Sequence, residues 1–468
     1  MTHSSGAAPG EARVRAAREQ RLADRLAAAL ARPTAQQPEW PDPARARSVV
    51  ARLRASPPIV TESETAQLSE RLSAVARGEA FLLQSGDCAE TFSEATEPHL
   101  RANLGLLKRM ALLLAHAAGL PVVPLARMAG QYAKPRSRPV DADGLPVYRG
   151  DMVNSAVRTL AARSPDPERM LRAHGHAARV MALARTVYAQ ELADPCAGIL
   201  SYLQGVPGGD RFARTAERIG PDPSPRSEQI YVGHEMLLLD YECAPLHTAG
   251  FTTGPEPLLA SPLAHFLWIG ERTRGLGDAH LAVAELLANP VGVKIGPSTT
   301  PEQAVEYVRR LDPHGTPGRL TLISRMGHAL VREVLPPIVE KVTATGHQVV
   351  WQCDPMHGNS RTTADGRKTR HFDDIVAEIS GFFEVHRTLG THPGGLHLEA
   401  TGEDVTECLG GARGLREDDL SARYRTACDP RLNAEQSMEL AFAVAELLTA
   451  VSRPAARQTT LHSSRSQR

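Results

Sequence analysis

Four side chains of the kinds that bind first-row metal ions are spread along the 468-residue chain: Cys88, His357, Glu399 and Asp429. Together they offer one sulfur, one nitrogen and two carboxylate ligands. Such a mixed set suits manganese, cobalt, iron or zinc, because calcium and magnesium prefer shells made only of oxygen. Three of them also have a simpler interpretation: Cys88 as a small buried thiol, His357 as a loop histidine bonded to backbone, and Asp429 as a turn aspartate before proline. Glu399 is harder to explain in that way, because a carboxylate in a strand-like run should not be buried unpaired.

A second group consists of cations that mostly follow strand-like runs: Arg127, Lys134, Arg136, Arg272, Lys294, Arg325 and Lys368. Lysine and arginine number 53, as do aspartate and glutamate, so the chain as a whole carries no net charge. Cations gathered on one face of a neutral protein indicate a local pocket for phosphates or carboxylates. The neutral charge excludes the whole-chain electrostatic footprint of a nucleic-acid binder, and an aromatic content of 4% argues against a stacking platform for single-stranded nucleic acid.

The elements that must position these residues alternate in type along the chain. Eight runs predict β-strands, at residues 80–85, 122–128, 198–203, 266–270, 291–295, 320–324, 348–352 and 396–400. Amphipathic patterns predict helices at 301–311, 331–345, 373–389 and 434–451. This alternation predicts an α/β fold, a (β/α)8 TIM barrel whose catalytic face is built by the loops after the strands, with a doubly wound open sheet as the alternative. Run 198–203 is the weakest of the eight, and residues 229–241 could form strand, helix or both.

Three regions follow from these patterns. Residues 1–78 predict a helical extension, in which Leu22, Leu26 and Leu30 recur at a four-residue spacing. Residues 79–453 predict the catalytic barrel, and 454–468 a polar, disordered tail. Because the leucine stripe of the extension needs a cover, we expect a homodimer or a larger homo-oligomer.

Six cysteines without a CxxC pair indicate a reducing compartment rather than a disulfide framework. The N-terminus lacks the apolar stretch of a secretory signal, and no apolar run approaches the ~20 residues that span a bilayer. We therefore expect a cytoplasmic protein with no membrane and no nucleic-acid partner.

Six segments resemble the class II (plant-type) 3-deoxy-D-arabino-heptulosonate 7-phosphate (DAHP) synthases, and the likeness extends over about residues 40–451. They are 81–90 (FLLQSGDCAE), 130–137 (GQYAKPRS), 268–273 (WIGERT), 289–297 (NPVGVKIGP), 351–359 (WQCDPMHGN) and 391–395 (THPGG). The resemblance implies a (β/α)8 barrel that condenses phosphoenolpyruvate with erythrose 4-phosphate and releases phosphate, the first step of the shikimate pathway and hence of chorismate and aromatic amino acid biosynthesis.

The resemblance also implies roles for individual residues. Cys88, His357, Glu399 and Asp429 become the ligands of a divalent metal, most simply Mn²⁺ or Co²⁺, with Fe²⁺ or Zn²⁺ as further choices. Phosphoenolpyruvate would be bound by Arg127, Lys294, Arg325 and the Glu271–Arg272 pair. The aldose phosphate would be bound by Lys134, Pro135, Arg136 and Ser137, together with Arg272 and Lys368. The metal would stabilise the alkoxide formed on carbon–carbon bond formation. Lys134 could donate a proton to that alkoxide, and Glu271 could orient the water that attacks C2.

The sequence departs from the family pattern at Ser85, where glycine is usual, at Gly327-His328, where Gly-Asn is common, and at Tyr202–Val206, where Asp-Trp-Asn is typical. The region that follows, to Tyr231, is shorter than in long family members, so we do not expect feedback inhibition by phenylalanine or tryptophan. Two alternatives stay open: a paralogue of a phenazine or antibiotic pathway that makes DAHP or aminoDAHP, and a non-catalytic barrel. Some family members pair with a chorismate mutase. Because Cys428 is next to Asp429, we expect its thiol to lie close enough to the thiol of Cys88 for oxidation to link the two.

Overall fold

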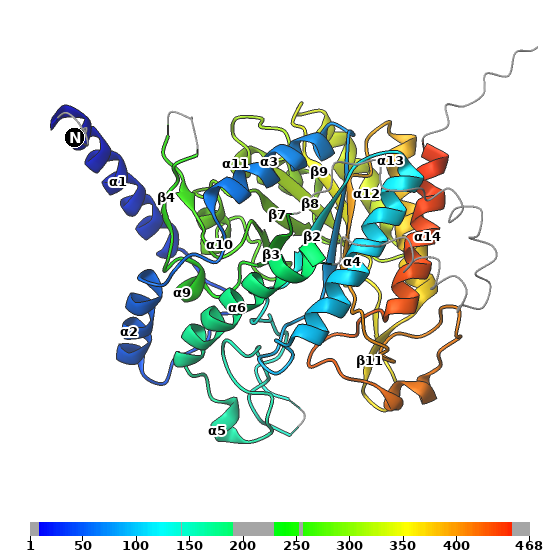
Figure 1. Cartoon of the computed structure of the whole chain (residues 1–468). Helices are drawn as coiled ribbons and strands as arrows, with labels where there is room; N and C mark the ends of the chain where they lie inside the picture. Colours follow the sequence, from blue (N-terminus) through cyan, green and yellow to red (C-terminus); the bar gives the residue numbers. More distant parts are fainter. Residues whose placement is uncertain (1–8, 142, 191–228, 252–255, 452–468) are drawn as a thin grey trace, which may run out of the picture.

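The computed structural model describes residues 9–141, 143–190, 229–251 and 256–451 (Figure 1). Eight parallel strands close into a barrel in the order β1-β12-β9-β8-β7-β6-β3-β2. Their bounds are β1 Phe81–Gly86, β2 Val122–Arg127, β3 Tyr231–Glu235, β6 Phe266–Ile269, β7 Val291–Ile295, β8 Leu320–Ser324, β9 Val350–Cys353 and β12 Gly395–Glu399. The barrel closes where β1 pairs with both β2 and β12. The predicted (β/α)8 fold is confirmed, and seven of its strands lie where the sequence patterns placed them.

The third barrel strand differs from the prediction. Residues 198–203, which we expected to form it, lie outside the described residues, and β3 stands between β2 and β6. The ambiguous stretch 229–241 supplies this strand and then the short helix α9, Leu239–Glu242. Gly233 allows the close approach, because an added Cβ would lie 2.8 Å from the carbonyl oxygen of Phe266. The polar His234 and Glu235 weaken the apolar pattern by which a buried strand is recognised.

Helices cover the outside of the barrel. Those that follow barrel strands are α4 Glu97–Ala118, α6 Glu168–Gln190, α10 Ala279–Ala284, α11 Pro301–Leu311, α12 Val331–Thr343, α13 Phe372–Thr388 and α14 Ala434–Val451. Helix α11 shows how the sequence sets a boundary: Thr300 and Gln303 form a capping box and Pro301 occupies the first turn. Helices α4 and α14 pack side by side, so the last helix closes the ring next to the first (Figure 1).

Three helices precede the barrel: α1 Pro9–Leu30, α2 Pro43–Arg54 and α3 Glu62–Ala76. Helix α3 buries Leu68, Leu72 and Val75 against inward-facing strand residues such as Phe266 and Val350, and so fills the end of the barrel where the strands begin. Helix α1 extends from the body beside α10, with Leu22 buried (Figure 1). Part of the leucine stripe is therefore covered within the chain, which removes much of the reason for expecting an oligomer.

Short elements complete the described part of the chain: α5 Leu160–Arg163, β4 His247–Thr248, β5 Leu259–Ala260, β10 Ser360–Thr362, β11 Lys368–Arg370 and the 3₁₀ helix η2 Glu417–Ala422. The pair β10–β11 is an antiparallel hairpin after β9, on the same side of the barrel as the predicted site. Among the described helices, none combines the length and the apolar character that crossing a bilayer requires.

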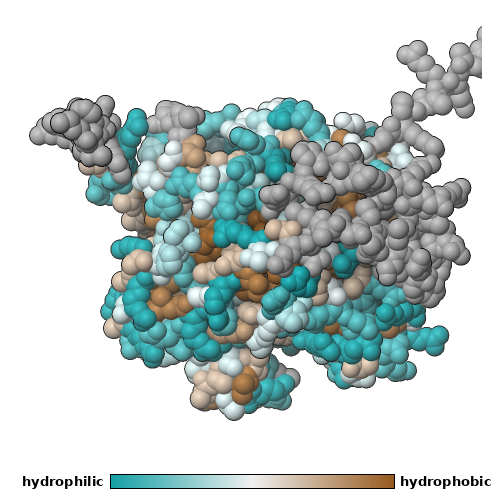
Figure 2. All heavy atoms as spheres, viewed as in Figure 1, coloured by the Kyte–Doolittle hydropathy of each residue, from teal (hydrophilic) through white to brown (hydrophobic). Residues whose placement is uncertain are grey.

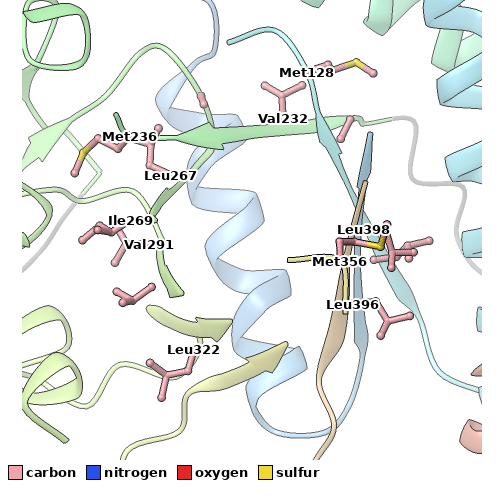
Figure 3. Packing of buried hydrophobic residues seen from close by; sticks show 14 of the residues in the cluster. Met128, Val232, Met236, Leu267, Ile269, Val291, Leu322, Met356, Leu396 and Leu398 are labelled. Atoms are coloured by element: carbon pink, nitrogen blue, oxygen red, sulfur yellow. The ribbon is translucent and has the colours of Figure 1, made fainter. Parts of the chain in front are cut away.

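The main apolar core lies between the strands and the surrounding helices. Figure 3 shows side chains from several strands in it, including Val232, Leu267, Val291, Leu322 and Leu396. Figure 2 shows one face of the surface, where hydrophobic areas are interspersed with hydrophilic ones. Because the strands are buried on both faces, their carboxyl ends are held rigidly. A site built from loops that follow eight separate strands requires this rigidity.

Candidate active site

A cavity of about 920 Å³ opens at the carboxyl ends of the strands. Of the predicted site residues, its walls contain Lys134, Pro135, Arg136, Ser137, Glu271, Arg272, Lys294, Arg325, His357, Lys368 and Asp429. The other three, Cys88, Arg127 and Glu399, are almost wholly buried. Cys88 and Glu399 bond to residues of that wall, and Arg127 bonds to Cys88 and Glu399. The structure thus brings all the predicted residues to one end of the barrel.

Cys88, Glu399 and Asp429 form a cluster in which one ligand atom of each lies within 4.8 Å of the others. The Sγ atom of Cys88 lies 3.6 Å from Oδ2 of Asp429, and the backbone N–H of Asp429 donates to this sulfur at 3.3 Å. A thiol and two acids at such spacing can share one divalent ion, and thiolate with carboxylates suits a first-row metal. The donor set therefore fits the metal that the sequence predicts.

His357 stands beside this cluster rather than within it. Its Nε2 atom lies 3.1 Å from Oε1 of Glu399, while Nδ1 lies 2.7 Å from Oδ2 of Asp354. A carboxylate on one ring nitrogen orients the other toward a metal in many protein sites. His357 is thus placed to supply the fourth ligand through Nε2, and Asp354, which the sequence analysis did not single out as a partner, would hold the ring.

The ammonium group of Lys134 lies among the three clustered ligands. Its Nζ is 2.8 Å from Sγ of Cys88, 3.3 Å from Oδ2 of Asp429 and 3.4 Å from Oε1 of Glu399. Burial alone would lower the pKa of Lys134, but Cys88, Glu399 and Asp429 raise it well above its usual value. A cation is therefore stabilised at the centre of this cluster, which is a further sign that the cluster binds positive charge.

The two acids of the cluster are held ionised by the cations around them. Burial would raise the pKa of Glu399, yet His357, Lys134 and Arg370 keep it well below its usual range. Burial would likewise raise the pKa of Asp429, and Lys134, Arg370 and Lys368 outweigh it and lower the pKa. Burial and the neighbouring Cys428 raise the pKa of the Cys88 thiol. A bound metal ion would have to displace the proton of this thiol.

Arg370, a fully buried residue at the end of β11, was missed by the sequence analysis. It donates to Oε2 of Glu399 at 2.7 Å, to the carbonyl oxygen of Met356 at 2.7 Å and to that of Pro430. Met356 precedes His357 and Pro430 follows Asp429, so one guanidinium joins the segments of three predicted ligands. No strand-end pattern marks Arg370, because it reaches the site from the β10–β11 hairpin.

The cations assigned to phosphoenolpyruvate lie at the ends of β2, β7 and β8, of which β7 and β8 are neighbours. Arg127 donates to the carbonyl oxygens of Asp87 and Cys88 and to Glu399, and it contacts His397. Lys294 pairs with the buried Asp354. Burial lowers the pKa of Lys294, and Arg127 lowers it further against the opposing effect of Asp354. Arg325 donates to the carbonyl oxygen of His357 at 2.8 Å.

Glu271 bonds to cations and a hydroxyl rather than pointing alone into the cavity. Its Oε1 accepts from Arg274 at 2.6 Å and from Ser298 at 3.3 Å, and its Oε2 lies 3.6 Å from Arg325. This arrangement allows Glu271 to position Arg325, and it ties up one of the oxygens that would orient a water.

The segment assigned to the aldose phosphate lies at the outer wall of the cavity. Arg272 donates to the Ser137 hydroxyl at 2.6 Å, and Lys368 pairs with Asp429 at 2.7 Å. Arg136 is fixed by two bonds: its Nε donates to the carbonyl oxygen of Tyr148, and its backbone N–H donates to Oε1 of Gln36 at 2.8 Å. Gln36 belongs to the loop after α1, so the N-terminal extension reaches the site, which no sequence pattern indicated.

A buried ionic network supports the cluster from below. Arg431 bonds to Asp87 at 2.5 Å and to Glu407, and so joins the neighbour of Cys88 to the segment of Asp429. His99 bonds to Asp87 at 2.8 Å and to Glu403 at 3.0 Å. Burial would lower the pKa of His99, but Asp87 and Glu403 raise it to about 9.

The chain is similar to known proteins over nearly its whole length. The model of the Class-II DAHP synthetase family matches residues 25–445. The phospho-2-dehydro-3-deoxyheptonate aldolase AroG of Mycolicibacterium smegmatis is 53% identical over 443 residues, which is 91% of this chain and 95% of the relative. The enzymes of the same name from Streptomyces coelicolor and Neurospora crassa are 49% and 40% identical, each over 89% of this chain and over 95% and 92% of their own.

Among solved structures, phospho-2-dehydro-3-deoxyheptonate aldolase from Francisella tularensis matches with a TM-score of 0.49 at 13% identity, covering 86% of this chain and 97% of that one. That likeness is too remote to add to the assignment. The family model and the sequence relatives suffice: this chain belongs to the class II DAHP synthase family.

Proposed function

We propose that this protein is a DAHP synthase, which condenses phosphoenolpyruvate with erythrose 4-phosphate and water to give DAHP and inorganic phosphate. The observation that carries the proposal is the cluster of Cys88, Glu399 and Asp429, which reaches a cavity walled by cations through Asp429. A metal site supports chemistry at a carbonyl oxygen, and a cationic wall supports the binding of two phosphorylated substrates.

The cluster and its neighbour His357 fit a divalent metal. Cys88, Glu399 and Asp429 would be three ligands, and His357 would supply the fourth through Nε2. When bound, the ion would polarise the aldehyde of the aldose and stabilise negative charge on its oxygen. Manganese, cobalt, iron and zinc all suit this mixed donor set, and the resemblance to the family favours manganese or cobalt among them. Arg370 and Asp354 would keep Glu399 and His357 in place.

Lys134 would donate the proton that the aldehyde oxygen gains. Its ammonium stands within hydrogen-bond reach of the ligand cluster, and its raised pKa keeps a proton on it at neutral pH. Arg325 with the Glu271–Arg272 pair would bind phosphoenolpyruvate, beside the buried Arg127 and Lys294. Pro135, Arg136 and Ser137, together with Arg272 and Lys368, would hold the aldose phosphate, so that its aldehyde lies toward Lys134.

The test is phosphate release from phosphoenolpyruvate, measured on purified protein stripped with a chelator and then loaded with one metal at a time. We expect release only when both the metal and erythrose 4-phosphate are present, and Cys88→Ser should abolish it. Full activity after exhaustive chelation, or in Cys88→Ser, would contradict the metal role. Assays with the imino analogue of the aldose separate a DAHP synthase from an aminoDAHP synthase. Phosphate release that does not depend on any aldose would refute the proposed function.

We further propose a cytoplasmic location, supported by five cysteines that carry no disulfide in the described part of the chain. A homodimer and a chorismate mutase partner remain predictions. Light scattering of the purified protein, alone and with a chorismate mutase of the same organism, tests both.

A further inference from the structure

Glu235 is a carboxylate of the cavity wall that no role above uses. It ends β3, lines the same cavity as Lys134 and Arg272, and has an Oε1 atom that is buried without a hydrogen-bond partner among the described residues. Buried polar atoms in native proteins nearly always have partners. Because Oε1 is shielded from solvent, a water or ligand in the cavity would be bound by Oε2, which also has no hydrogen-bond partner among the described residues.

The fold fixes this side chain from two sides. The backbone N–H of Glu235 donates to Oε1 of Gln131 at 3.0 Å, and Gln131 donates to the carbonyl oxygen of Ala133, the residue before Lys134. On the other side the carboxylate lies against Gly270, where an added Cβ would stand 2.0 Å from Oε1. Only glycine at 270 leaves room for the carboxylate in this position. Glu235 is thus held between the segment of Lys134 and that of Glu271.

The other carboxylates around the site are neutralised by cations. Glu271 pairs with Arg274, Asp354 with Lys294, and Glu399 with Arg370. Asp429 pairs with Lys368 and Lys134. Glu235 has no ion pair among the described residues, although the cavity it faces is rich in cations.

A carboxylate in this position would repel the phosphate groups of both substrates, so its partner must carry a proton that it can accept. Water and a sugar hydroxyl are the two candidates. The order of the strands favours water. β3 lies between β6, which precedes Glu271 and Arg272, and β2, which ends at Arg127, and it is two strands from β1 and three from β12. Both neighbouring strands thus lead to residues assigned to phosphoenolpyruvate, whereas the strands that precede Cys88 and carry Glu399 are farther away.

We propose that Glu235 is a catalytic residue: its carboxylate binds and deprotonates the water that adds to C2 of phosphoenolpyruvate. This deepens the proposed function and rests on it. As C3 bonds to the aldehyde carbon, the C2–C3 π electrons form the new bond and C2 becomes electron-poor. The water oxygen bonds to C2 and one of its protons passes to Glu235, while Lys134 protonates the aldehyde oxygen.

The later half of the reaction returns these protons. The C2–O bond to phosphate breaks, the C2 hydroxyl loses its proton to give the ketone, and the departing phosphate takes the proton held by Glu235. The proton from the C2 hydroxyl restores Lys134. The sum is phosphoenolpyruvate plus erythrose 4-phosphate plus water giving DAHP plus phosphate, with both carboxylate and amine regenerated.

The experiment compares full-length, metal-loaded wild type with Glu235→Gln and Glu235→Asp in the phosphate-release assay. Because general bases contribute typically ~10²–10⁴-fold, Glu235→Gln should lower kcat by about that factor. The KM of each substrate should stay within about twofold, and so should phosphoenolpyruvate affinity measured by calorimetry without aldose. The wild-type kcat should fall on acidification through one ionisation, and this limb should vanish in Glu235→Gln and persist in Glu235→Asp.

Asp143→Asn is the matched control, since it removes a carboxylate from the exposed loop beyond Ser137, where Asp143 pairs with Arg158. It should behave as wild type. Three results would overturn the proposal: a kcat of Glu235→Gln within threefold of wild type, an acid limb that survives in it, or a raised aldose KM at unchanged kcat, which would mean that Glu235 binds a sugar hydroxyl. If Glu235→Gln does not fold, Glu235→Asp decides by its kcat and its acid limb. Wild type without aldose-dependent release would instead refute the proposed function.

Discussion

Replacing Arg370 by methionine tests whether one buried guanidinium assembles the metal site. Methionine keeps much of the apolar stem but removes the three donors that reach Glu399 and the carbonyl oxygens of Met356 and Pro430. Glu399 is left buried with one cation fewer, and two buried carbonyls lose a donor. The segments that carry His357 and Asp429 are then free to move apart.

The size of the effect follows from these contacts. Groups that orient metal ligands typically contribute ~10–100-fold in metal affinity, which corresponds to about 1.4–2.8 kcal/mol. Breaking a buried ion pair by removing one partner costs ~3–5 kcal/mol of folding free energy. We expect Arg370→Met to lower both quantities by these amounts, and Arg370→Lys, which keeps the charge but only one attachment point, to lie between.

The assay is a competition of each variant with a chromophoric chelator for Mn²⁺ or Zn²⁺, next to urea unfolding followed by circular dichroism. Arg361→Met is the control, because Arg361 lies on the other strand of the same hairpin, is exposed and pairs only with Asp374 among the described residues. Its effects should stay within about 0.5 kcal/mol. Metal affinity in folded Arg370→Met equal to that of wild type would refute the reasoning.

Three further predictions concern His99, Cys428 and Gln36. His99 has a pKa of about 9 in the folded protein against ~6.5 unfolded, so its stabilisation is complete below pH ~6.5 and is lost as pH rises through 9. Urea unfolding from pH 6 to 9 should show a loss of about 3 kcal/mol that His99→Gln flattens, and an equal slope in both proteins would contradict it. Cys88 lowers the pKa of the Cys428 thiol against the effect of burial, so hydrogen peroxide should link the thiols and release metal from wild type but not from Cys428→Ser; equal release would count against the link. Gln36→Ala removes an acceptor from the backbone of Arg136 and should raise the aldose KM about two- to tenfold at constant kcat, and an unchanged KM would show that the extension does not shape the site.

The sequence predicted the parts of the site that follow from barrel topology. Cys88, Lys294, Arg325 and Glu399 each end or follow a strand, and parallel strands of a closed barrel must present such residues at one face. Asp429 follows no strand. It reaches Glu399 because the backbone after β12 pairs with the segment after Asp429, at Ala400 and Leu432.

What the sequence missed lies in elements without a strand-end signature. Arg370 comes from a short hairpin, Gln36 from a loop of the N-terminal extension, and Glu235 from a strand whose polar residues disguise it. Each of these residues acts through a contact with a distant part of the chain: 60 positions separate Arg370 from Pro430, 100 separate Gln36 from Arg136, and 104 separate Glu235 from Gln131. Local periodicity cannot reveal such contacts, because they depend on how the loops fold over the barrel.

The bonds of the cations show how their tasks divide. Arg127 has five N–H groups, and it already donates to two carbonyls and Glu399 and contacts His397. Lys294 contacts Asp354, His357 and His397. These two buried cations have little donor capacity left for a substrate, so their main effect is a positive potential beneath it. Arg272, with Ser137 as its hydroxyl partner, keeps donors for a phosphate. We therefore propose that anion binding rests mostly on the outer wall, while the inner cations stabilise the acids of the predicted metal site.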